Sequence, residues 1–260
     1  MDNPNNNLLF FHSKSALTPL NPRDHFHNTY EFYLLINGDV EYVVGDATYS
    51  LQPYDLLLIK ASVYHYAKLL SDKPYERFCI NFTLEDVAEE LRPILNETRV
   101  RYPFQNNKLM KNLYAALDAL KETASYDDTL TFCRQIVNML LLQLKYAPSE
   151  NENAQITHPT LSKILNYIDE HLHETLNAND IAEIFFVSTS WISYIFKKHF
   201  HIPYKQYVNH RKMLHAQQLI QSGTPPTQTA LLCGFEEYAT FYRQYKRHFG
   251  TSPQTDKKAT

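Results

Sequence analysis

Residues 181–250 contain two stretches built on one plan, IAEIFFVSTSWISYIFKKHF (181–200) and TALLCGFEEYATFYRQYKRHFG (229–250). Each begins with a short apolar segment, passes through a turn and continues as a helix pattern with one apolar face. The two copies also end alike, because 196–200 and 245–249 both read as an aromatic residue, two cations, His and Phe. This repeat predicts that one chain presents two similar helices.

The outer face of each repeated helix is polar. Ser188 can begin the first helix, because a serine hydroxyl accepts a hydrogen bond from a free backbone N–H of the first turn. Gly234 suits the sharp turn before the second helix. Apolar residues then recur at the i, i+3, i+4 spacing of a one-sided helix. The residues left facing outward are Thr189, Ser190, Ser193, Tyr194 and Lys197 in the first helix and Tyr238, Ala239, Tyr242, Arg243 and Lys246 in the second.

At these residues the chain resembles the AraC/XylS family of bacterial transcription regulators. The matching residues are Ile181-Ala182, Ser188, Phe196-Lys197-Lys198, Pro203, Tyr207, Arg211, Ala216, Leu219, Ala230, Gly234-Phe235, Phe241, Arg243, Phe249-Gly250 and Pro253. Phe186, Thr227, Thr240 and Asp256 depart from the family pattern. The resemblance implies a C-terminal all-α DNA-binding domain, 160–260, in which a long helix from about Tyr204 to Gln221 joins two helix-turn-helix units.

The resemblance also implies binding to double-stranded DNA. An α-helix fits the major groove, and two helices on a rigid bridge can enter successive grooves about 34 Å apart. By motif position, base contacts are expected from Thr189, Ser190, Ser193, Tyr194, Tyr238, Ala239, Tyr242 and Arg243. Phosphate contacts are expected from Lys197, Lys198, Lys246 and Arg247. Each of these side chains could instead be an ordinary solvent-facing helix residue.

The net charge of −3 conceals two regions of opposite sign. Residues 1–157 carry 14 Lys or Arg and 20 Asp or Glu, whereas residues 188–260 carry 10 and 3. A basic surface attracts phosphate, and its binding weakens as salt rises. The two regions are therefore expected to have different partners, with DNA on the basic one.

Residues 1–148 are expected to form an all-β, cupin-like barrel or jelly roll at about 8–103, followed by two helices within 105–146. Short runs of β-branched, aromatic and aliphatic residues alternate with turn signals, of which Asn37-Gly38 and Gly45-Asp46 predict hairpins. In the resembled family such helices commonly form the contact of a homodimer, although they could pack only within the chain. The polar residues 149–159, with proline near both ends, predict a linker.

The β region carries a histidine pattern. His25, His27, Glu31 and Gly38 resemble the first motif of the cupin barrel, and residues 55–65 resemble a degraded second motif that keeps His65. A pocket for a small organic effector, with a sugar as the leading candidate, is the preferred interpretation and requires no cofactor. The expected lining is His25, His27, Glu31, Tyr33, Tyr42, His65 and Arg77. A first-row metal held by His25, His27, Glu31 and His65 is the alternative.

Together these features predict a sequence-specific transcription regulator that acts as an activator. A bound sugar is expected to shift the population of dimer geometries that can reach DNA. RNA polymerase is a further candidate partner. Two alternatives stay open: a metal-dependent cupin enzyme, and a constitutive DNA-binding dimer with a purely structural barrel. No catalytic residues are expected. The lack of an 18-residue apolar run and of a signal-peptide pattern predicts a cytoplasmic protein without a membrane partner. Cys79, Cys133 and Cys233 are expected to be buried thiols.

Overall fold

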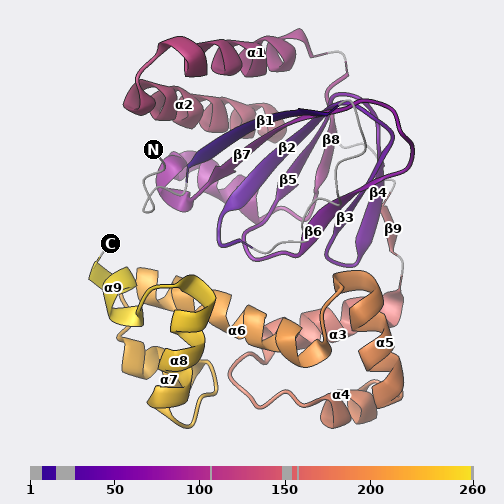
Figure 1. Cartoon of the computed structure of the whole chain (residues 1–260), viewed down its shortest axis with the longest axis vertical. Helices are drawn as coiled ribbons and strands as arrows, with labels where there is room; N and C mark the ends of the chain where they lie inside the picture. The colour runs from indigo at the N-terminus through magenta and orange to yellow at the C-terminus, as the bar shows by residue number, and fades with distance from the viewer. Residues whose placement is uncertain (1–7, 16–26, 106, 148–153, 157, 259–260) are drawn as a thin grey trace. The chain divides into compact units, whose positions relative to one another are not determined.

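The computed structural model describes residues 8–15, 27–105, 107–147, 154–156 and 158–258 (Figure 1). The chain divides into two compact units, Met1–Gln155 and Ile156–Thr260. Each unit is described by itself. In both, the apolar pattern of the sequence explains which residues are buried.

The first unit contains two β-sheets. The strands are β1 (Leu9–Ser15), β2 (Tyr30–Asn37), β3 (Val40–Val44), β4 (Ala47–Leu51), β5 (Asp55–Ile59), β6 (His65–Leu69), β7 (Tyr75–Phe82), β8 (Arg101–Pro103) and β9 (Ala154–Ile156). A five-stranded sheet has the order β1-β7-β2-β5-β8, and a four-stranded sheet has the order β6-β3-β4-β9. The pairings among β1 to β8 are antiparallel.

The sheets face each other across an apolar core but do not close into a barrel within the described residues. Their strand orders end on β1 and β8 in one sheet and on β6 and β9 in the other. Side chains alternate along β2, so this strand contributes to two apolar cores. Tyr33 and Leu35 point between the sheets, whereas Phe32 and Leu34 point to the opposite face. The expected cupin-like jelly roll is confirmed, and a closed barrel is wrong.

Helices cover the outer face of the five-stranded sheet. They are the 3-10 helices η1 (Leu84–Asp86) and η2 (Glu89–Asn96) and the α-helices α1 (Lys108–Thr123) and α2 (Tyr126–Lys145). Ser125 caps α2 by accepting a hydrogen bond from the Asp128 backbone N–H. Ile136 and Leu140 of α2 pack in one cluster with Phe32 and Ile80 of the sheet. The two helices predicted within 105–146 therefore belong to the first unit (Figure 1).

One prediction about connections needs correction. Gly45-Asp46 does join a hairpin of β3 and β4, but Asn37-Gly38 does not, because β2 pairs with β5 and β7 on its two edges and β3 lies in the other sheet. The chain changes sheets at Gly38, which has a φ of 129°. Within the predicted linker 149–159, Ala154–Ile156 forms β9 beside β4, and residues 149–153 and 157 lie outside the described residues.

The second unit is helical. Its helices are α3 (Pro159–Glu170), α4 (Ala178–Ile184), α5 (Thr189–Phe200), α6 (Tyr204–Gln221), α7 (Pro226–Leu232), α8 (Tyr238–Phe249) and α9 (Pro253–Lys258). The predicted cap is present, because the Ser188 hydroxyl accepts a hydrogen bond from the Trp191 N–H at 3.0 Å. The predicted bridging helix is α6. Helices α5 and α8 both end on a left-handed residue, His201 and Gly250, so the sequence repeat is also a structural repeat.

Candidate nucleic-acid interface and ligand pocket

Helix α5 presents a polar face opposite a buried one. Ile192, Phe196 and Phe200 are buried. The predicted base-contacting residues of this helix are all exposed: Thr189, Ser190, Ser193 and Tyr194. The Lys198 ammonium lies 5.5 Å from the ring centroid of Tyr194. This face offers hydroxyl groups and one aromatic ring for contact with base edges.

Helix α8 differs in part from the prediction. Ala239 and Arg243 are exposed, but Tyr238 and Tyr242 are half-buried. Tyr238 packs against the apolar cluster of this helix, and its hydroxyl accepts a hydrogen bond from the Gln254 side chain of α9. The Tyr238 side chain is therefore partly committed to packing, whereas Arg243, whose Nη2 is 3.4 Å from the Thr240 hydroxyl, reaches outward.

Exposed cations lie in the last turns of both helices. Lys197 and Lys198 occupy the end of α5, and Lys246 and Arg247 occupy the equivalent end of α8. Cations near a helix C-terminus interact favourably with its dipole, so each pair also stabilises its own helix. Whether these cations contact phosphate stays a prediction.

Two residues that sequence reasoning missed hold the second unit together. Lys212 of α6 is buried, and its Nζ donates to the backbone oxygens of Glu174 at 2.7 Å and Cys233 at 3.0 Å. It thereby ties the bridging helix to the segment before α4 and to the second helix-turn-helix unit. Asp256, noted above only as a departure from the family pattern, accepts hydrogen bonds from the Tyr245 and Thr251 hydroxyls at 2.6 and 2.7 Å.

The first unit has a pocket of about 300 Å³ between its two sheets. Its lining residues are Leu9, Phe11, His27, Glu31, Tyr42, Tyr66, Ala67, Arg77, Cys79 and Asn81. They include residues of the edge strands β1 and β6, so the pocket lies where the sheets stay open. Four residues of the predicted lining are among them, His27, Glu31, Tyr42 and Arg77. His65 and Tyr33 contact members of this set instead, and His25 lies outside the described residues.

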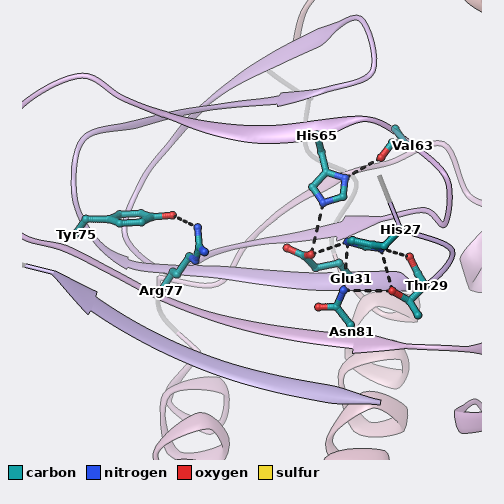
Figure 2. Close-up of polar contacts among 8 residues, drawn as sticks. All are labelled: His27, Thr29, Glu31, Val63, His65, Tyr75, Arg77 and Asn81. Atoms are coloured by element: carbon teal, nitrogen blue, oxygen red, sulfur yellow. Dashed lines mark hydrogen bonds and ion pairs between the residues drawn. The ribbon is translucent and has the colours of Figure 1, made fainter. Parts of the chain in front are cut away.

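One end of the pocket is a histidine–carboxylate cluster. Figure 2 shows Glu31 between His27 and His65, whose Nε2 atoms lie 3.0 and 3.5 Å from the same oxygen, Oε2. The opposite ring nitrogens are anchored to the backbone, because Nδ1 of His27 lies 2.8 Å from the Thr29 oxygen and Nδ1 of His65 lies 2.7 Å from the Val63 oxygen. Burial works to raise the pKa of Glu31, but its contacts with the two histidines hold that pKa well below its usual range.

The same three residues could hold a metal ion. Their candidate ligand atoms lie within 4.8 Å of one another. Ligating histidines usually donate their second ring nitrogen to a carbonyl or carboxylate, as both do here. Two imidazoles and one carboxylate suit a divalent first-row metal. Thus the structure brings together three of the four residues of the predicted metal set.

The other end of the pocket is cationic. Arg77 Nη1 donates to the Tyr75 hydroxyl at 2.8 Å, and the Tyr75 and Tyr33 hydroxyls lie 2.9 Å apart. Arg77 keeps its charge, because a guanidinium stays protonated in proteins.

A larger hollow of about 460 Å³ lies on the opposite face of the five-stranded sheet, beside α1. Most of its charged lining residues already contact one another, because the His12 ring lies 3.0 Å from Glu76 and 2.8 Å from Asp118. Of the predicted effector residues that the structure describes, none lines this hollow. The pocket between the sheets is therefore the better candidate.

Comparison with known proteins covers both units. Residues 18–133 match the model of the AraC-like ligand binding domain, and residues 181–259 match that of a helix-turn-helix domain. The chain belongs to the AraC/XylS family of transcription regulators. It is accordingly a DNA-binding transcription regulator, and the alternative of a cupin enzyme is set aside.

Relatives match over nearly the whole chain. The "Probable transcriptional regulator LumQ" of Photobacterium leiognathi is 26% identical over 88% of this chain and 89% of its own length. The transcriptional activator RhaS of Pectobacterium carotovorum is 21% identical over 95% and 94%. The melibiose operon regulatory protein of Escherichia coli is 20% identical over 91% and 84%. Among solved structures, ToxT of Vibrio cholerae matches with a TM-score of 0.42 and 13% identity over 97% of this chain and 98% of that one.

None of the described helices combines the length and the apolar character that crossing a bilayer requires. All three cysteines are free and buried, as predicted.

Proposed function

We propose that this regulator reads a specific DNA sequence with α5 and α8 and that a small sugar-like molecule bound between the two sheets makes it an activator. The observation that carries the first part is the repeated geometry of the two helices. Both present polar or cationic side chains outward and end in a pair of exposed cations. Two such helices fixed to one bridging helix suit successive major grooves.

The roles of individual side chains follow from their chemistry and exposure. The exposed hydroxyls of α5 and the guanidinium of Arg243 suit base edges, since arginine can bind the two acceptors of guanine together. Lys197, Lys198, Lys246 and Arg247 suit phosphate, which sets register and affinity but not sequence. Tyr238 is assigned a smaller part than the other predicted residues, because its hydroxyl already contacts α9.

Replacing Arg243 with alanine is expected to weaken binding to the preferred DNA site by about 1 to 3 kcal/mol and to relax discrimination at one base pair. Lys197→Ala is the matched comparison, because it should weaken binding to every duplex by a similar factor. Dissociation constants on the preferred site and on single-base-pair variants separate the two effects. Equal losses on preferred and scrambled duplexes for both variants would remove Arg243 from base recognition.

Several features favour a sugar-like effector and activation. The pocket combines aromatic walls with fixed hydrogen-bonding groups, which is the chemistry of a sugar site. One relative is named a transcriptional activator, and another is named for the operon of melibiose, a disaccharide. Activation would also imply a contact with RNA polymerase.

A homodimer is part of the proposal. Helix α2 carries exposed Met139 and Leu142, and its C-cap residue Tyr146 continues this apolar stripe at the spacing i, i+3 and i+7. Such a stripe on the outside of the sensor unit suits a second copy of the chain. A ligand that changes how two subunits meet would then change how two DNA-binding units reach their half-sites.

Effector coupling is tested on the full chain with sugars, with and without a chelator. A sugar at about 100 times its Kd should add about 2.7 kcal/mol of stability and should change DNA affinity and transcription. Stabilisation without any change in affinity, half-site spacing or transcription would reject the coupling and favour a constitutive DNA-binding dimer. A stabilisation that requires metal and is abolished by chelator would assign His27, Glu31 and His65 to an ion.

A further inference from the structure

Arg77 carries a charge that no described residue neutralises. Its position on β7 turns it toward the four-stranded sheet, on the same face as Tyr75 and Cys79, which lie in the core between the sheets. Its hydrogen bond from Nη1 to the Tyr75 hydroxyl is to a neutral group. Nε is buried without a hydrogen-bond partner, and within the described residues no Asp or Glu forms an ion pair with the guanidinium. A cation in such surroundings costs free energy unless a counter-charge reaches it.

Glu31 lines the same pocket but contacts two histidines instead of Arg77. Its Oε2 is already shared by His27 and His65. In the ladder of β2 and β7, Glu31 stands opposite Asn81 whereas Arg77 stands opposite Leu35. These positions are four residues apart, or about 13 Å of strand. The pocket therefore has a cation at one end and, at the other, a carboxylate that contacts two histidines, as Figure 2 shows.

The guanidinium is held in a fixed orientation. Its central carbon lies 5.4 Å from the ring centroid of Tyr75 and 6.0 Å from that of Tyr33. Because Nη1 is taken by Tyr75 and Nε is inaccessible, Nη2 is the nitrogen left for a ligand. A carboxylate oxygen can accept a charge-assisted hydrogen bond from it. A dianionic phosphate is a poorer match, since Arg77 is the only Lys or Arg among the described residues that line the pocket.

We propose that the ligand of this pocket carries a carboxylate, bound by Nη2 of Arg77. The inference rests on the proposed effector pocket and narrows its ligand to a small polyhydroxylated acid, such as a sugar acid. The remaining lining fits such a molecule. His27, Glu31 and Asn81 offer hydrogen-bonding groups for hydroxyls, and Leu9 and Phe11, 37% and 49% exposed on the edge strand β1, offer an apolar surface for C–H groups.

The test uses the full chain and matched pairs of ligands that differ only in the acid group, glucose with glucuronate and galactose with galacturonate, together with lactate and its amide. Thermal shift and calorimetry measure binding to the wild-type chain and to Arg77→Gln. At least one acid is expected to bind while its neutral partner does not, and Arg77→Gln is expected to bind that acid at least ten-fold more weakly. Arg77→Lys keeps the charge but not the planar fork, so its affinity should be intermediate.

Lys68→Gln is the matched control, because Lys68 is an exposed cation of β6 that does not line the pocket. It should leave acid binding unchanged. Without ligand, Arg77→Gln should melt no lower than wild type, because the substitution removes an unneutralised charge. If it does not fold, Arg77→Lys supplies the comparison. If acids and their neutral partners bound equally well, and substitution of Arg77 changed neither affinity, the proposal of a carboxylate ligand would be overturned. The proposal of a sugar effector would not be affected by that result. Binding by no acid would also overturn it.

Discussion

Replacing Gly234 with alanine is expected to lower the free energy of unfolding of the second unit by at least about 3 kcal/mol. Gly234 lies in the turn between α7 and α8 with a φ of 71°. A Cβ there would stand 2.5 Å from the backbone oxygen of His173 and 2.9 Å from its carbonyl carbon, neither of which can move without shifting the backbone. The methyl group would thus separate the second helix-turn-helix unit from the segment before α4, with loss of DNA affinity.

Gly250→Ala is the control for backbone strain alone. Its φ is 73°, close to that of Gly234, but an added Cβ would meet nothing within 4 Å. The expected loss is about 1 to 2 kcal/mol. Trp191 is the only tryptophan of the chain and lies in the second unit, so its fluorescence during denaturant unfolding of the full chain reports both variants. Equal losses for the two alanines would mean that the contact with His173 does not constrain the turn.

Removing the four exposed cations at the ends of α5 and α8 is expected to weaken DNA binding about a thousand-fold at 0.15 M salt and to flatten its salt dependence. Each phosphate contact contributes about −0.9 to the slope of log K against log salt, so four contacts contribute about −3.6. The variant replaces Lys197, Lys198, Lys246 and Arg247 with glutamine, which keeps the helix propensity. Binding is measured from low to physiological salt on one duplex.

A control variant with the same change in net charge distinguishes the effect of local phosphate contacts from the effect of the net charge of the chain. Lys14, Lys68, Lys73 and Lys145 are exposed residues of the first unit, and their replacement by glutamine also removes four positive charges. This control should retain most of the salt slope of the wild type. If both variants flattened the slope alike, the cations of α5 and α8 would have no special role in phosphate contact.

The helical unit could be predicted from sequence because its signals are local. The Ser188 cap, the i, i+3, i+4 apolar spacing and the repeated ending of α5 and α8 depend on residues within one turn of one another. Lys212 and Asp256 could not be predicted in this way. Their partners, Glu174 and Cys233 for one and Tyr245 and Thr251 for the other, come together only when the helices pack.

The β unit was harder to predict because its pairings are distant in sequence. Asn37-Gly38 has the local chemistry of a hairpin, yet both edges of β2 are occupied by β5 and β7, and the chain changes sheets instead. The histidine pattern correctly anticipated the meeting of His27, Glu31 and His65. It gave no indication that Tyr75 would engage one edge of Arg77, since that depends on side-chain orientation in the folded sheet.

Selecting bound sequences from a pool of random duplexes with the full chain tests whether α5 and α8 each read DNA. We expect two blocks of preferred base pairs in each half-site, with centres about one helical turn, or about 10 base pairs, apart. Arg243→Ala should weaken the preference in one block and leave the other intact. A single block, or a bound pool with the same composition as the input, would show that the two helices do not both read DNA.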